Sequence, residues 1–148
     1  MEGAALNNAN GTAETTTVAV AGDRDAYRAA FDLLKQARFE QAKQAFANFL
    51  QAYPGSGLVD NAQYWLAEAN YVSREFQQAI VEFRKVTASY PDSSKVPDAL
   101  LKIGYCYYEL EDWDAARNAL NEVTQRFPDH AAAGLAAERL QRMANEGN

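Results

Sequence analysis

The sequence predicts an all-α protein made of three stacked helix pairs and one further helix at the C-terminal end. Three observations support this fold class. The sequence repeats with a fixed period, the apolar residues within each period have helical spacing, and turn-forming residues recur at equivalent places.

The period is clearest at three aromatic–proline dipeptides, Tyr53-Pro54, Tyr90-Pro91 and Phe127-Pro128, which lie 37 residues apart. Four more columns have the same offset. They are Phe39, Phe76 and Trp113; Ala42, Ala79 and Ala116; Phe46, Phe83 and Leu120; and Phe49, Val86 and Val123. Agreement between independent columns indicates a repeated structural unit.

Each unit contains two helices, because its apolar residues recur every three or four positions and a break divides them. Proline and small polar residues separate one unit from the next. We expect helix pairs over residues 24–52, 58–89 and 95–126, within repeats 24–54, 58–91 and 95–128. A capping helix is expected over 130–145, with polar residues that include Arg139 and Arg142 facing solvent.

The N-terminal residues 1–22 have a different composition, rich in Ala, Asn, Thr and Gly and without aromatic residues. This composition is typical of a flexible polar linker, so we expect the folded domain to span residues 23–148. We also expect part of residues 5–22, around Thr17 to Val20, to occupy a groove of its own chain or of a neighbouring molecule and imitate a ligand.

Charge and composition exclude several functional classes. A net charge of −6 disfavours nucleic acid and anionic membranes as partners and favours a basic protein segment. The chain contains no apolar run long enough to span a membrane and no signal-peptide pattern, so it is expected to be soluble as given.

The columns of small residues resemble the tetratricopeptide repeat (TPR), in which such residues let two antiparallel helices approach closely. Ala30, Ala67 and Gly104 take this position in the first helices, and Ala42, Ala79 and Ala116 take it in the second. The resemblance implies a right-handed α-solenoid. Phe76 and Phe83 are predicted to lie in its core.

In such a stack the first helix of each pair lines the inner surface, where partners usually bind. Residues expected on this surface are Tyr27, Phe31, Leu34, Tyr64, Glu68, Tyr71, Leu101, Tyr105 and Tyr108. Tyr27 and Tyr64 suit the core equally well, since aromatic residues at helical spacing often pack internally. Glu68 is expected to attract a Lys or Arg of the partner.

No catalytic or metal-binding constellation is recognisable, so we predict a protein that is not an enzyme and needs no cofactor or metal. His130, the only histidine, follows Pro128-Asp129 and is expected to cap a helix or lie exposed. Cys106, the only cysteine, is expected to be a small buried apolar residue, and no internal disulfide is possible.

Residues from about Asp25 to Met143 resemble the C-terminal TPR domain of the YbgF/CpoB family of the bacterial Tol-Pal cell-envelope system. The stretches that carry the resemblance are AFDLLKQARFEQAKQAFANFLQAYPGS, NAQYWLAEANYVSREFQQAIVEFRKVTASYPDSSKVPDALLKIGYCYYEL and ARNALNEVTQRFP.

The resemblance implies a periplasmic interaction scaffold that binds TolA and coordinates outer-membrane constriction with septal peptidoglycan synthesis during cell division. Family members also carry a signal peptide and an N-terminal coiled coil, and the coiled coil makes the full-length protein a trimer. These 148 residues contain neither segment. The alternative function is a TPR subunit of an outer-membrane protein assembly complex.

Overall fold

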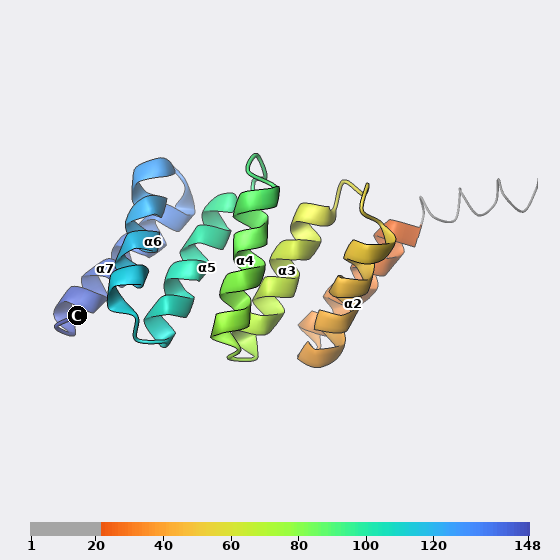
Figure 1. Cartoon of the computed structure of the whole chain (residues 1–148), viewed down its shortest axis with the longest axis horizontal. Coiled ribbons are helices and arrows are strands. Elements are labelled where there is room, and N and C mark those ends of the chain that lie inside the picture. The colour runs from red at the N-terminus through yellow and green to blue at the C-terminus, as the bar shows by residue number, and fades with distance from the viewer. Residues whose placement is uncertain (1–21) are drawn as a thin grey trace, which may run out of the picture.

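The computed structural model describes residues 22–148, and this part of the chain is entirely helical. The first helix spans residues 22–35. It is followed by α2 (Phe39–Ala52), α3 (Val59–Val72), α4 (Phe76–Ser89), α5 (Val96–Glu109), α6 (Trp113–Arg126) and α7 (Ala131–Asn145). The helices succeed one another across the molecule in chain order (Figure 1) and form a solenoid of helix pairs. The outer bounds of each helix pair and of α7 lie within two residues of the expected ranges. The linker expected over residues 1–22 and its groove-binding segment lie outside the described residues, except that Gly22 begins the first helix.

The two helices of each pair are joined by a tight turn with one residue in the left-handed conformation. These residues are Ala37 (φ 59°), Arg74 (φ 64°) and Glu111 (φ 59°), again at the 37-residue period. In the last of these turns the Glu111 amide donates to the Tyr108 carbonyl and the Asp112 amide to the Tyr107 carbonyl. This pattern is the Schellman motif, which pairs carbonyl groups that a helix end would leave free.

The longer turns between repeats are fixed by a second periodic contact. The Ser56 hydroxyl donates to Asp23 Oδ2 at 2.8 Å, and the Ser93 hydroxyl donates to Asp60 Oδ2 at 2.6 Å. Each serine oxygen also accepts from a backbone amide two residues ahead. The serine thus connects the turn to the first helix of the preceding pair. At the next equivalent position His130 Nδ1 accepts from the Ala132 amide at 3.0 Å, which confirms that His130 caps a helix.

The core runs along the seam between the helices and contains the predicted columns. Ala42, Ala79 and Ala116, with Phe46, Phe83 and Leu120, are fully buried. Ala30, Ala67 and Gly104 face them from the first helices. Trp65 packs against both the N-terminal and the C-terminal core clusters and so connects them.

The packing departs from that of a uniformly apolar core in two places. Phe76, expected in the core, is only partly buried and packs against the C-terminal end of α3. Gln63 and Glu82 are buried side by side, with Gln63 Nε2 donating to the Glu82 carboxylate at 2.6 Å and to its backbone carbonyl at 2.9 Å. The two hydrogen bonds that Gln63 donates to Glu82 reduce the cost of burying these polar groups. Within residues 22–148, no helix combines the length and apolar character that crossing a membrane requires.

Candidate protein-binding surface

The surface predicted for partner binding is built by the first helix of each pair together with α7. We call it the first-helix face and define it by Phe31, Glu68, Tyr71, Lys102, Tyr105, Tyr108 and Arg139. The residues from α3 (Glu68, Tyr71) and those from α5 (Lys102, Tyr105, Tyr108) are spaced three positions apart, so their side chains share one side of each helix. Contact between α5 and α7 continues this face to the C-terminal end.

Two of the predicted surface residues belong to the core. Tyr64 is 6% exposed and makes an edge contact with the Phe83 ring at 5.5 Å, and Leu101 is 3% exposed. Both therefore hold helices together, as the alternative interpretation of Tyr64 allowed. We leave them out of the proposed surface.

At the N-terminal end, Tyr27 and Phe31 are partly buried and stack with their ring centres 6.3 Å apart. Tyr27 also makes an edge contact with the buried Phe46 ring, with 6.1 Å between the ring centres. Phe31 makes an edge contact with Trp65, with 5.1 Å between the ring centres. The two rings line a shallow hollow of about 330 Å³ together with Arg24 and Arg28. Leu34, one turn further on, is partly buried against the N-terminal core.

Towards the C-terminal end, aromatic rings and cationic groups alternate across three helices. Lys102 Nζ lies 4.5 Å from the Tyr71 ring centre and 6.0 Å from that of Tyr105. The Arg139 guanidinium carbon lies 4.0 Å from the Tyr105 ring centre and 4.6 Å from that of Tyr108. Each cation is thus within reach of two rings, a geometry that attracts a positive charge to the negative faces of the rings.

The repeat itself places these groups. Lys102 and Arg139 occupy the same position of successive repeats, 37 residues apart, and so do Tyr71 and Tyr108. Each of these two tyrosines is supported by the first aromatic residue of the following helix. Tyr71 contacts Phe76 at 5.6 Å, and Tyr108 contacts Trp113 at 5.4 Å.

The electrostatics differ from the expectation that Glu68 would be available to a basic partner. Glu68 Oε1 already forms an ion pair with Lys102 Nζ at 3.1 Å, and both side chains are largely buried. At the C-terminal end of the first-helix face, the Tyr108 hydroxyl donates to Glu146 Oε1 at 2.6 Å. Arg139 forms no ion pair with a carboxylate among residues 22–148, so the centre of the row has an excess positive charge.

Two buried polar atoms in this region lack a hydrogen-bond partner within the described part of the chain. They are Glu68 Oε2 and Arg139 Nη1. A buried polar group without a partner is costly, and a partner segment that supplied a donor to one and an acceptor to the other would remove that cost.

Burial also affects the tyrosines. It raises the pKa of Tyr71 to about 12, although the nearby Arg139 charge opposes the shift. Burial likewise raises the pKa of Tyr105, again opposed by Arg139. Both phenols are therefore protonated at neutral pH and can donate hydrogen bonds to a carbonyl or carboxylate.

Cys106 lies on the core side of α5, as predicted, and is fully buried. Burial raises the pKa of its thiol to about 12, which disfavours the reactive thiolate.

Sequence reasoning missed the cations of the first-helix face. Lys102 is not among the residues expected on the binding surface. Arg139 is expected on the solvent side of the capping helix, whereas it lies against the rings of Tyr105 and Tyr108 on α5. The column Arg28, Trp65, Lys102 and Arg139, at the 37-residue offset, contained the signal. Its alternation with the tyrosine columns becomes apparent only when α5 and α7 are placed side by side.

Two family models, both described as tetratricopeptide repeat, match the chain over residues 27–94 and 98–130. Solved structures with the same fold include the TPR domain of Arabidopsis OM64, with 16% identity, a TM-score of 0.68, and coverage of 84% of this chain and 98% of that one. The N-terminal domain of stress-induced protein-1 of C. elegans has 14% identity and a TM-score of 0.67, with coverage of 81% and 95%. Identities this low establish the fold alone.

A curated relative provides a closer but shorter match. The cell division coordinator CpoB of Pseudomonas putida is 59% identical over 44 residues. The matched segment is 30% of this chain and 16% of that protein. The chain belongs to the tetratricopeptide repeat proteins, and its matched segment is similar to the cell division coordinator CpoB.

Proposed function

We propose that the chain is a non-catalytic interaction module that binds a segment of another protein on its first-helix face. The observation that carries this proposal is the row of partly exposed rings alternating with Lys102 and Arg139. Tyrosine and arginine are the residues that contribute most often to binding energy at protein interfaces. A rigid helical support also limits the entropy lost on binding.

The chemistry of the face specifies the partner segment. Apolar side chains would contact the tyrosine rings, and a carboxylate would contact Arg139, whose Nη1 lacks an acceptor in the described structure. Glu68 is engaged by Lys102, so a basic residue of the partner would have to compete with an existing ion pair. The proposed partner segment is therefore apolar and acidic.

Similarity to CpoB supports a more specific role. We infer that the protein acts in the periplasm as part of the Tol-Pal system, binds TolA, and coordinates outer-membrane constriction with septal peptidoglycan synthesis. Trimerisation belongs in this proposal to a coiled coil elsewhere in the full-length protein.

Calorimetric titration of the periplasmic domains of TolA into the protein tests the proposal. Tyr105→Ala and Arg139→Ala should each weaken binding by about tenfold or more, because each removes a contact at the centre of the row. Arg117→Ala is the matched control, since Arg117 lies on α6 and pairs with Asp114 of the same helix. Equal affinity of the wild type and both face variants would contradict the proposed surface, and an absence of TolA binding would contradict the proposed partner.

A further inference from the structure

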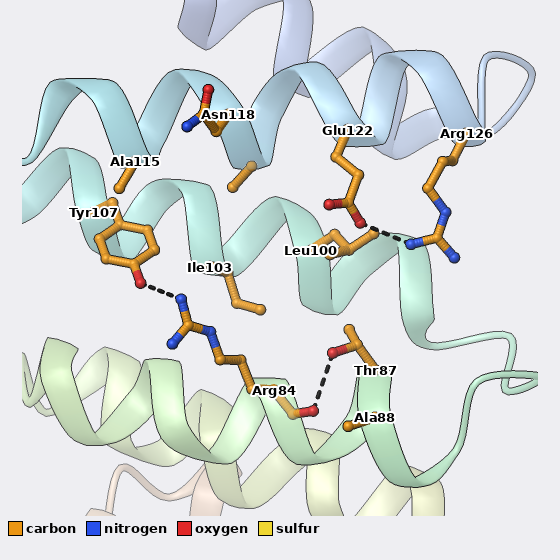
Figure 2. Close-up of a pocket in the computed structure, with 11 residues that line it drawn as sticks. Arg84, Thr87, Ala88, Leu100, Ile103, Tyr107, Ala115, Asn118, Glu122 and Arg126 are labelled. Atoms are coloured by element: carbon orange, nitrogen blue, oxygen red, sulfur yellow. Dashed lines mark hydrogen bonds and ion pairs between the residues drawn. The ribbon is translucent and has the colours of Figure 1, made fainter.

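A second hollow lies on the opposite side of α5 from the first-helix face. The helices α4 and α6 form its walls and α5 forms its floor (Figure 2). We call it the outer groove and define it by Arg84, Leu100, Ile103, Tyr107, Ala119 and Glu122. Its volume is about 520 Å³, enough for one or two side chains of a bound peptide.

Comparison of the repeats explains why this groove is open. In the preceding repeat, the positions equivalent to Leu100 and Ala119 are occupied by Gln63 and Glu82. There the Glu82 side chain lies over α3 and accepts from Gln63 at 2.6 Å, with both side chains buried. Around α5 the longer wall residue is replaced by alanine. Within residues 22–148 the equivalent space is the hollow of the outer groove.

The floor of the outer groove selects the kind of group that can enter. Leu100 and Ile103 are apolar and largely buried. Leu100 stands where the preceding repeat has the polar Gln63, and Ile103 stands where it has Leu66. A polar tip in contact with them would lose its hydration without gaining a hydrogen bond. An aliphatic or aromatic side chain of a partner fits this floor.

The rim adds a positive charge. The Arg84 guanidinium lies over the Tyr107 ring, 5.6 Å from its centre, and donates to the Tyr107 hydroxyl. It forms no ion pair with a carboxylate anywhere in residues 22–148. Arg126, by contrast, is paired with Glu122 at 2.7 Å (Figure 2). Arg84 is therefore held at the edge of the apolar floor with its charge available.

From these contacts we propose that the outer groove is a second protein-binding site, which receives an apolar side chain with a carboxylate next to it in the sequence. The site is independent of the proposed function, because its residues come from the side of α5 away from Tyr105 and Arg139. One molecule can thus hold two protein segments at once.

The test uses the blocked tripeptide acetyl-Glu-Leu-Glu-amide as probe, with amide chemical shifts of the protein recorded by NMR. Saturable shifts should concentrate at Leu100, Ile103 and Ala119. Acetyl-Lys-Leu-Lys-amide and acetyl-Glu-Ser-Glu-amide should shift these amides at least fivefold less at equal concentration, since each lacks one of the two required features.

Two variants probe the groove directly. Ala119→Met fills the hollow from within and should abolish the shifts. Arg84→Glu reverses the rim charge and should weaken binding at least tenfold. The matched controls are Ala137→Met, at an exposed position of α7, and Arg117→Glu, on α6 outside the groove, and both should bind as the wild type does.

Three results would overturn the proposal. The Lys-Leu-Lys peptide could shift the groove amides as strongly as the Glu-Leu-Glu peptide, or the shifts could fall only on the first-helix face. Alternatively, the groove amides could shift with protein concentration when no peptide is present, which would assign the groove to a second copy of the chain. Thermal unfolding of Ala119→Met, measured alongside, separates a filled groove from a misfolded variant.

Discussion

Leu120 packs so closely against Gly104 that a Cβ atom built on the glycine would lie 2.6 Å from Leu120 Cδ2 and 2.8 Å from its Cγ. Leu120 is fully buried, so moving it away from a new Cβ would disturb the core packed around it. In the two preceding repeats alanine and phenylalanine occupy these positions. In the third helix pair the smaller glycine therefore faces the smaller leucine, whereas in the first two pairs alanine faces phenylalanine.

Gly104→Ala should therefore destabilise the protein, although alanine is by far the better helix former. Overpacking costs about 1–3 kcal/mol, which exceeds the gain of about 1 kcal/mol in helix propensity. Chemical denaturation monitored by circular dichroism measures the difference. Gly134→Ala is the control, because a Cβ at Gly134 would meet nothing within 4 Å, and this variant should be stabilised.

Phe83→Ala and Phe76→Ala should differ clearly in their effect on stability. Phe83 is fully buried, so its truncation should lower the free energy of unfolding by about 3–5 kcal/mol. Phe76 is partly exposed and should cost about half as much or less. Equal losses would indicate that Phe76 is as deeply packed as the sequence pattern suggested.

Glu111→Gly should stabilise the protein. Glu111 has a φ of 59°, and the left-handed conformation raises the free energy of a residue with a Cβ by about 1–2 kcal/mol. Glycine avoids this strain but makes the unfolded chain more flexible, which offsets part of the gain. We expect a net gain of about 0.5–1 kcal/mol in urea denaturation. Glu111→Ala retains the Cβ and serves as control, so a gain of the same size there would assign the effect to the lost charge.

The stability of the protein should fall at alkaline pH. Burial raises the pKa of Cys106 from 9.0 to about 12 and that of Tyr71 from 10.0 to about 12. Well below pH 9 both groups are protonated in the folded and unfolded states and contribute no pH dependence. Between pH 9 and 12 the unfolded state loses protons that the folded state retains, so the unfolded state gains in relative stability.

Denaturation series at pH 8, 9.5 and 11 test this dependence. The loss assigned to the thiol should be about 3 kcal/mol at pH 11. Cys106→Ala should remove the part of the decline that begins near pH 9 and leave the part that begins near pH 10. Alanine already occupies the equivalent buried position 69 in the preceding repeat, so the variant should fold. A decline of unchanged size in the variant would exclude Cys106 as its source.

The fold was predictable because its determinants are local and repeated. Proline after each second helix, alanine or Gly104 at each close contact and aromatic residues at helical spacing predict every one of the three pairs. A wrong interpretation of one column is therefore corrected by the others. Phe76 is less buried than its spacing predicts because its column, Phe39, Phe76 and Trp113, forms the first residue of each second helix, and all three are only partly buried.

The binding surface was only partly predictable because it depends on which helices become neighbours. Tyr71, Tyr105 and Tyr108 could be placed on one face from their spacing. The position of Arg139 between two of these rings depends on the packing of α7 against α5, which no pattern within either helix reveals. The outer groove depends on the volume left by Ala119, and this follows only from comparison with the filled space around Glu82.

The stacking of helices on their chain neighbours has a consequence for how the molecule opens. Among α2–α7, extensive contacts join each helix to the next, and beyond this α7 also reaches α5. A helix at either end can therefore separate without disturbing those in the middle. Amide hydrogen exchange should accordingly be slowest in α3, α4 and α5 and faster towards both ends, because local unfolding would proceed from the ends inward.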